Sequence, residues 1–428
     1  MGLAILLGCF ILGMLIGMPI AFALGLAALL AAFHEGVPQI IVFQRMIAGM
    51  NVFSLLAIPF FIFAGELMMR GGIALRLVQF AQAVVGRMRG GLGLVNVLSS
   101  MLFGGISGSA VADTSALGSV LIPMMRARGY DDDFSVNVTV TSSIAGVVVP
   151  PSHNMILYSL AAGGGISISG LFLAGVVPGA LMCLCLGIAT YAVAVRRGYP
   201  SEAFPGWRAV AMAGLVAIPG LLTAVVIIGG VISGIFTVTE SAAVGVIYAL
   251  LVTGVVYRSL GLRAFWESVV QSIRTTAMVM ILIGTATSFA YFLALYEVPA
   301  LILDALLGVS DNPLVILLLI NLSLLVLGTF MDMGALILIC TPIFLPVVRE
   351  IGMDPVQFGI VLMMNLGLGL TTPPVGACLF VGCSIAKVRI ESVLRTIWPF
   401  YLAVLVALAL TTYLPAVSLT LPGLLQGG

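Results

Sequence analysis

The chain has 428 residues, of which 61% are apolar and only 8% are charged, and its formal net charge is +1. Because soluble proteins carry about 25% charged residues, this composition excludes a soluble protein and predicts an all-α polytopic membrane protein in a lipid bilayer. Nucleic-acid binding is excluded too, since the sequence contains no basic patch. The six cysteines are scattered through apolar segments without the spacing of a metal site, so we expect small buried side chains there.

Apolar segments follow one another from end to end of the chain. Residues 3–33 lack a preceding basic region and are too long for a signal peptide, which predicts one retained helix. A second apolar run covers 53–69, and the arginines interleaved with apolar residues over 70–89 are typical of a segment at the membrane interface. Further helices are predicted over 171–195, 210–232, 242–257, 275–296, 299–307, 313–327 and 396–414.

An internal repeat is visible when the chain is shifted by 223 positions. The pairs that coincide without a gap are Gly105 with Gly328, Pro123 with Pro346, Gly129 with Gly352, Gly146 with Gly369, and Pro150-Pro151 with Pro373-Pro374. Glycine and proline are the residues that break or turn a helix, so a constant offset among them indicates a duplicated unit. We expect inverted repeats with two re-entrant helical hairpins and two broken helices.

The two broken elements predict a binding site at the membrane midplane of a secondary transporter. Helix breaks leave carbonyl oxygens that hydrocarbon cannot satisfy, and together with hydroxyls these oxygens suit a small hard cation. We therefore expect one sodium ion per copy. The first predicted sodium site is Gly105, Ser107, Ser142, Ser143, Gly146 and Pro150, and the second is Gly328, Met331, Asp332, Gly369, Thr372 and Pro373. The alternative is that these small residues only permit close helix packing.

The first copy is the more polar of the two, since Asp113 aligns with Leu336 and Ser107 with Phe330. An intramembrane carboxylate favours a functional site, although a structural aspartate is the alternative. The candidate substrate-binding residues are Ser107, Ser109, Asp113, Ser152, His153 and Asn154. His153 is as compatible with a capped structural histidine as with a ligand contact, and Asp332 is as compatible with a helix cap as with a sodium ligand.

An enzyme is the remaining alternative. Residues 105–108 fit the GxSG nucleophile pattern of rhomboid-type intramembrane serine proteases, with Ser107 as nucleophile and His153 as base. Four residues are a weak signal, and this hypothesis leaves the duplication unexplained. We therefore expect a protein that is not an enzyme.

At these residues the chain resembles the large membrane subunit of the tripartite ATP-independent periplasmic (TRAP) transporters. The blocks that carry the resemblance are GMPIAFALG at 17–25, AIPFFIFAGELM at 57–68, SGSAVADTSALGS at 107–119, GIFTVTESAAVGVIYAL at 234–250 and NLGLGLTTPPVG at 365–376. The resemblance implies sodium-driven uptake by an elevator mechanism across the bacterial inner membrane, with at least two sodium ions and no other cofactor. It also implies a separate small membrane subunit and a periplasmic substrate-binding protein.

The resemblance further implies a division into scaffold and transport parts. The expected division is a scaffold with an arm over 1–92, transport half 1 over 93–200, a second scaffold part over 201–312, transport half 2 over 313–395 and a C-terminal helix over 396–428. The motif SGSAVAD at 107–113 is similar to that of sialic acid and other sugar-acid members, so N-acetylneuraminate is the expected substrate. The alternatives are a C4-dicarboxylate or another organic acid, and a stand-alone sodium/carboxylate carrier.

Overall fold

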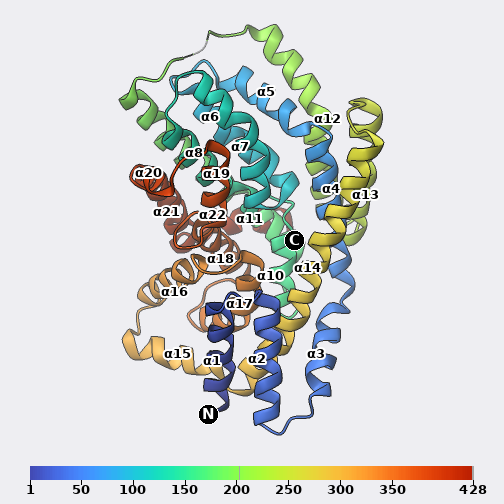
Figure 1. Ribbon diagram of the computed structural model, residues 1–428, viewed down its shortest axis with the longest axis vertical. Helices are drawn as coiled ribbons and strands as arrows, with labels where there is room; N and C mark the ends of the chain where they lie inside the picture. Colours follow the sequence, from blue (N-terminus) through green and yellow to red (C-terminus); the bar gives the residue numbers. More distant parts are fainter. Residues whose placement is uncertain (202, 427–428) are drawn as a thin grey trace.

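A computed structural model describes residues 1–201 and 203–426, apart from the side chains of residues 106, 107 and 426. Every described element is helical (Figure 1). The first half contains α1 Gly2–Leu15, α2 Ile20–His34, α3 Ile40–Met50, η1 Phe53–Leu56, α4 Ala57–Arg70, α5 Ile73–Val85, α6 Gly91–Ser107, α7 Ala110–Ala127, α8 Asp132–Ser142, α9 Ala145–Val148, α10 His153–Ala161 and α11 Ile168–Arg197. The second half contains α12 Trp207–Ile232, α13 Val238–Leu250, the π-helical η2 Leu251–Val256, α14 Leu262–Leu295, α15 Val298–Val309, α16 Pro313–Gly328, α17 Met333–Glu350, α18 Pro355–Gly369, α19 Ala377–Ala386, α20 Ile390–Leu394, α21 Trp398–Tyr413 and α22 Pro415–Gln426.

Within the described residues, six helices are long and apolar enough to cross a membrane, or eight if each of two bent pairs counts as one span. One bent pair is α8–α9 with α10, which turns by 55° where the predicted break lies. The peptide bonds Pro150-Pro151 and Pro373-Pro374 are both cis. The all-helical membrane class predicted from composition is therefore confirmed.

The prediction of one helix over residues 3–33 is wrong. Two shorter helices, α1 and α2, lie side by side instead (Figure 1). Gly17 adopts a left-handed φ of +80° and Pro19 directly precedes α2, so the chain reverses at this point. At Gly13 an added Cβ would lie 3.1 Å from the Ala23 Cβ, which places small side chains where the two helices meet. Apolar content alone did not reveal this turn.

The start predicted for the helix at 275–296 is also wrong, because α14 begins at Leu262 and is 34 residues long. The other predicted helices fall on α11, α12, α13 with η2, α15, α16 and α21. Residues 70–89 form mainly α5, which lies across the upper end of the molecule in Figure 1.

Elements of the two halves have matching order and bounds. Shifting α7 by 223 positions gives the bounds of α17, and α8 then starts where α18 starts. The first hairpin is α6–α7 and the second is α16–α17. Each meets the broken helix of its half at a pair of facing glycines: a Cβ on Gly104 would clash with Gly146, and a Cβ on Gly369 would clash with Gly328. These contacts require glycine, as the packing alternative expects. That the copies are inverted relative to the membrane stays a prediction.

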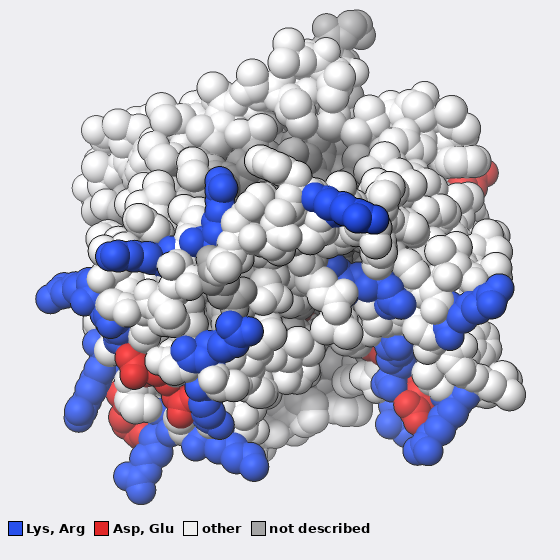
Figure 2. Space-filling view, turned by 90° about the horizontal axis from the view of Figure 1, so that it is seen from above, with Lys and Arg blue, Asp and Glu red and all other residues white. Residues whose placement is uncertain are grey.

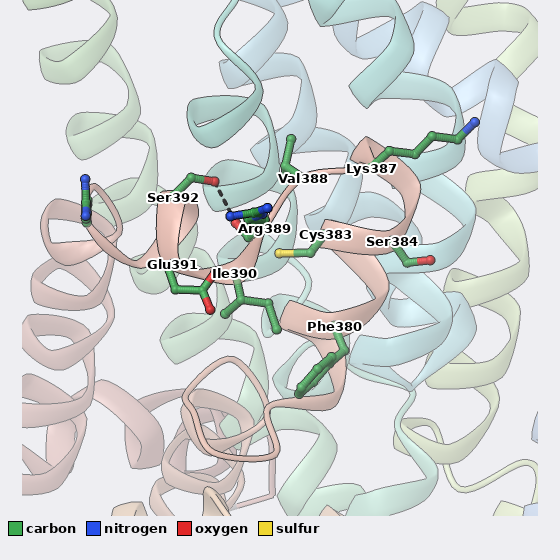
Figure 3. A pocket seen from close by; sticks show the side chains of 10 residues that line it. Phe380, Cys383, Ser384, Lys387, Val388, Arg389, Ile390, Glu391 and Ser392 are labelled. Atoms are coloured by element: carbon green, nitrogen blue, oxygen red, sulfur yellow. Dashed lines mark hydrogen bonds between the residues drawn. The ribbon is translucent and has the colours of Figure 1, made fainter.

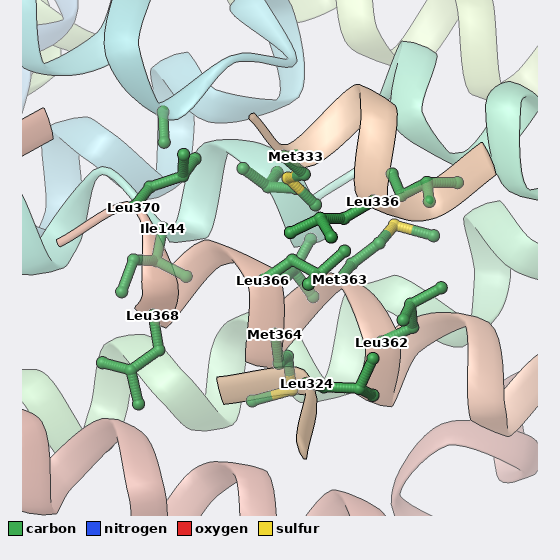
Figure 4. Close-up of a cluster of buried hydrophobic side chains, with 14 of the residues drawn as sticks. Ile144, Leu324, Met333, Leu336, Leu362, Met363, Met364, Leu366, Leu368 and Leu370 are labelled. Atoms are coloured by element: carbon green, nitrogen blue, oxygen red, sulfur yellow. The ribbon is translucent and has the colours of Figure 1, made fainter. Parts of the chain in front are cut away.

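Two groups of helices build the molecule. On one side, α4 packs against α13 and α14, and α14 also packs against α2 and α3. On the other side, α19 of the second half packs against α7 and α8 of the first. The core beneath the second hairpin is almost purely aliphatic, formed by side chains of α16, α17 and α18 together with Ile144 (Figure 4). The second hairpin therefore lies on an apolar core.

Candidate functional site

A cavity of about 630 Å³ lies between the two groups of helices. One wall is formed by α4 and α14, and the other by the start of α7, by His153 and by Asp332. The lining residues are Ile62, Gly65, Glu66, Met69, Arg70, Ser109, Val111, Ala112, Ser115, His153, Gln271, Thr275, Met278, Val279, Leu282 and Asp332. Polar groups from both halves thus meet in one concave site, as is typical of small-molecule sites.

The tip of the first hairpin is held against the start of α10. Gly108 has a left-handed φ of +61° and ends α6, after which Ser109 caps α7 by accepting a hydrogen bond from the Ala112 amide at 3.4 Å. The Asn154 side-chain amide donates to the Gly108 carbonyl at 3.0 Å. A Cβ on Gly108 would lie 2.9 Å from the His153 Nδ1, so only glycine leaves room for the imidazole. Ser109, His153 and Asn154 are therefore brought together.

The tip of the second hairpin carries Asp332 as the N-cap of α17. Its Oδ2 accepts a hydrogen bond from the Gly334 amide at 2.9 Å, as the capping alternative expects. The residue also faces a smaller cavity of about 90 Å³, whose lining includes Ser109, His153, Asn154 and Gly334. Residues from both hairpin tips therefore line the same two cavities.

Two of the predicted substrate-binding residues lie elsewhere. Asp113 is 1% exposed, and the structure does not bring it to either cavity. Its Oδ2 lies 3.6 Å from where a Cβ on Gly146 would be, and Ser100 is a neighbour of the carboxylate. Ser152 is fully buried behind His153. Ser107 ends α6, and its side chain lies outside the described residues.

Asp113 is a buried carboxylate whose two oxygens accept no well-formed hydrogen bond from any residue that the structure describes. Ser100, one of its neighbours, belongs to a polar seam between α6 and α8. In that seam the Asn96 amide donates to Thr139 Oγ1 at 2.6 Å, and the Ser100 and Ser142 hydroxyls lie 3.0 Å apart. Burying an unpaired charge costs several kcal/mol or more, so this position calls for a cation or a proton.

The first predicted sodium set gathers where hairpin and broken helix meet. A Cβ on Gly105 would meet the Pro150 carbonyl oxygen at 2.5 Å, and Gly146 lies against the neighbouring Gly104. Ser142 is engaged in the polar seam, and the Ser143 hydroxyl donates to the Val140 carbonyl at 2.8 Å. The Pro150 carbonyl oxygen therefore lies at this junction, and a hydroxyl that donates a hydrogen bond still has lone pairs that can bind a cation.

Of the second predicted set, Gly328 and Gly369 meet at the corresponding junction of the other half, whereas Asp332 lines the cavity. The Val375 amide donates to the Thr329 carbonyl at 3.1 Å, which joins the segment after the proline pair to the second hairpin. The Thr372 hydroxyl donates to the Leu368 carbonyl at 2.9 Å. Searched over the described residues, the chain has no cluster of three His, Cys, Asp or Glu side chains that would hold a metal ion. That these junctions bind sodium stays a prediction.

The cavity wall formed by α4 and α14 was not predicted from the sequence. Glu66 and Arg70 lie four residues apart in the otherwise apolar run AIPFFIFAGELMMR, and Gln271 and Thr275 lie four apart on α14. Polar pairs with this spacing lie on one helix face, which was the available signal.

A larger hollow, of about 820 Å³, lies between the end of α19 and α20. Figure 3 shows Arg389 at its centre, while Lys387 extends away from it. Its charged lining residues are exposed, and it contains none of the predicted site residues. The cavity at the hairpin tips is therefore the candidate site.

Comparison with known proteins decides the family. The family model described as "Tripartite ATP-independent periplasmic transporter, DctM component" matches residues 7–417. The chain belongs to this family. It is 43% identical to the uncharacterized protein YgiK of Salmonella typhimurium, over 98% of this chain and 97% of that protein. It is 40% identical to the sialic acid TRAP transporter large permease protein SiaM of Vibrio cholerae, over 96% of both.

A further relative is the C4-dicarboxylate TRAP transporter large permease protein DctM of Rhodobacter capsulatus, with 37% identity over 99% of this chain and all of that protein. Among solved structures, the YdaH transporter of Alcanivorax borkumensis is similar in fold, with a TM-score of 0.64 and 14% identity over 87% of both chains. The TRAP large subunit inferred from the sequence motifs is thus confirmed. The protein is a membrane transporter subunit for an organic acid and not an enzyme, so the protease hypothesis is set aside.

Proposed function

We propose that this TRAP large subunit carries out sodium-coupled uptake of N-acetylneuraminate across the bacterial inner membrane, together with a small membrane subunit and a periplasmic binding protein. The observation that carries the proposal is the cavity in which Ser109 and His153 of the first half meet Asp332 of the second. A site shared by both halves is what a duplicated secondary transporter needs at its midplane.

Three helix N-termini converge on this space. Ser109 precedes α7, Ser152 precedes α10 and Asp332 precedes α17. The N-terminal end of a helix carries a partial positive charge and free amides, which favour the carboxylate of an organic acid. The hydroxyl and amide groups of Ser109 and Asn154 are then placed to bind hydroxyls of a sugar acid.

Sodium coupling is proposed from the two oxygen-rich junctions. We assign Asp113 to the first of them, because its unpaired carboxylate lies beside Gly146 and away from both cavities. A sodium ion bound there offsets the cost of burying that charge. Each elementary charge moved across 100 mV contributes about 2.3 kcal/mol, so two or more sodium ions carried with one anion are driven inward.

The elevator mechanism is proposed from the cavity's two unlike walls. The hairpins form one wall and the α4–α14 pair forms the other. If α4 and α14 belong to a fixed scaffold, movement of the hairpins along them exposes the site to one side of the membrane at a time. The apolar groove of about 420 Å³ between α4 and α14, lined by Pro59, Phe60, Phe63 and Ile273 among others, is where we propose that the small subunit docks.

Orientation is proposed from charge. Four loops meet at the upper end of Figure 1, joined by hydrogen bonds from the Gly90 amide and the Tyr130 hydroxyl to the Pro200 carbonyl and from Arg126 to the Ala386 carbonyl. Figure 2 shows lysines and arginines gathered on this face. Basic residues favour the cytoplasmic side, so we assign this face to the cytoplasm.

Proteoliposomes with all three components test the proposal. We expect uptake of labelled N-acetylneuraminate that stops when external sodium is replaced by potassium. Uptake that is indifferent to the cation would exclude sodium coupling.

The second candidate substrate is a C4-dicarboxylate, favoured by the 37% identity to DctM. Calorimetry on the cognate binding protein, with N-acetylneuraminate and succinate in parallel, separates the two. Tight binding of succinate alone would exclude the sugar acid and leave the TRAP assignment intact.

A further inference from the structure

Arg70 is the only arginine or lysine among the residues that line the cavity. It is the last residue of α4, at the end that leads into α5 (Figure 1). Its Nη1 donates to Glu267 Oε2 at 2.8 Å and its Nε to Glu66 Oε2 at 3.4 Å. Arg70, Glu66 and Glu267 form an ion triplet that has no part in the hairpin-tip site.

Distance along α14 separates Arg70 from the second hairpin tip. Glu267, which binds Arg70, lies near the start of this helix, whereas Leu282 lies 3.7 Å from where a Cβ on Gly334 would be, at the second tip. The two positions on α14 are about 22 Å apart at a rise of 1.5 Å per residue. A small organic acid cannot span this length, so it cannot contact the Arg70–Glu267 pair and the second hairpin tip at once.

Glu267 can leave Arg70 without losing all of its cationic partners. Glu267 also accepts a hydrogen bond from Arg263 Nε at 3.0 Å, so it keeps a cationic partner when it leaves Arg70. The side chains of Arg70 and Glu267 are 33% and 45% exposed, which places their ion pair among those that contribute only about 0–1 kcal/mol. A carboxylate that replaces Glu267 on the guanidinium forms the same kind of bond, at little net cost.

We propose that Arg70 is a transit site for the substrate carboxylate at the cytoplasmic mouth of the cavity. The substrate leaves the hairpin tips, displaces Glu267 from Arg70 and then passes to the cytoplasm. The positive charge of Arg70 makes the mouth of the cavity selective for anions. This inference rests on the proposed transport function. Arg70 therefore raises the affinity of the carrier for substrate on the cytoplasmic side. It does not affect sodium binding.

The test measures inhibition of uptake by substrate loaded inside right-side-out proteoliposomes of the full complex. The probe is N-acetylneuraminate, or succinate if the binding protein selects it. We expect Arg70→Gln to raise the internal concentration for half-inhibition about 10-fold, the scale of one lost charge-assisted pair. Arg70→Lys should restore part of this loss. Glu267→Gln should shift the value the opposite way, because Arg70 then lacks its competing partner.

Arg89→Gln is the matched control, since it removes an exposed arginine that does not line the cavity. The sodium dependence of uptake should be the same in all variants. An unchanged half-inhibition in Arg70→Gln, or a shift of the same sign in Glu267→Gln, overturns the transit site. If Arg70→Gln fails to insert, the sign of the Glu267→Gln shift decides. Loss of sodium-coupled uptake in the unmodified protein would instead reject the proposed function.

Discussion

The two hairpin units share a backbone plan and differ in what they bury. Asp113 corresponds to Leu336, and Thr139 and Ser143 correspond to Leu362 and Leu366. In the first unit these positions form a polar seam with an unpaired carboxylate, whereas in the second they belong to the aliphatic cluster of Figure 4. The glycines and prolines at turns and close contacts are therefore sufficient to preserve the fold of the unit. The residues between them can differ in polarity and take different chemical roles.

The largest effect is expected at the position where the two units differ most. Asp113→Leu introduces the residue of the second unit, removes a buried unpaired charge and should leave thermal stability unchanged or higher. Sodium-driven uptake should fall by about 100-fold or more, the scale of about 2.7 kcal/mol at a lost charge contact. Uptake in proteoliposomes and thermal unfolding measure the two effects. Normal uptake would show that the polar seam is structural only.

Both units contain a close contact between two glycines, Gly104 with Gly146 and Gly328 with Gly369. Gly104→Ala and Gly369→Ala should each destabilise the protein by about 1–3 kcal/mol, because a Cβ would clash with the facing glycine. Gly229→Ala is the control, since no atom lies within 4 Å of its added Cβ. Thermal unfolding of the purified complex measures all three. Equal stability of the variants would mean that the hairpins are loosely seated.

At the second hairpin tip, the substitution Asp332→Asn removes the charge but keeps the helix cap. Asparagine caps a helix as well as aspartate does, so Asp332→Asn should preserve thermal stability. If the charge contributes to substrate or sodium binding, uptake should fall by about 10-fold, equivalent to 1.4 kcal/mol. Ser109→Asn makes the same type of exchange at the first tip, where no charge is lost. Unchanged uptake in Asp332→Asn would show that Asp332 acts only as a helix cap.

The smallest effect is expected at the outer ends of the hairpins. Arg126 donates to Asp132 at 2.6 Å with a side chain that is 46% exposed, whereas its counterpart Arg349 forms no ion pair within the described residues. Such an exposed pair contributes about 0–1 kcal/mol. Arg126→Gln should therefore lower the unfolding temperature slightly, and Arg349→Gln should leave it unchanged. A large loss for Arg126→Gln would point to its contact with the Ala386 carbonyl instead.

Turns and caps were the part of the fold that the sequence predicted best. Gly129 and Gly352 both adopt left-handed φ angles near +80°, and both proline pairs lie at the breaks that were expected. The helix reversal at Gly17 carries the same signal of glycine and proline, but the unbroken apolar run around it concealed the turn. Local signals were therefore sufficient where polar residues accompanied them.

Sequence alone determined the helical membrane class, the duplicated unit and the family, because composition, backbone-restricting residues and motif blocks are local properties of the chain. Tertiary structure decided that Asp113 lies away from both cavities and that α4 and α14 supply the opposite wall of the site, with Arg70 at its mouth. The direction in which a helical side chain points follows from how that helix is rotated against its neighbours. That rotation results from packing between segments distant in sequence, which no local pattern specifies.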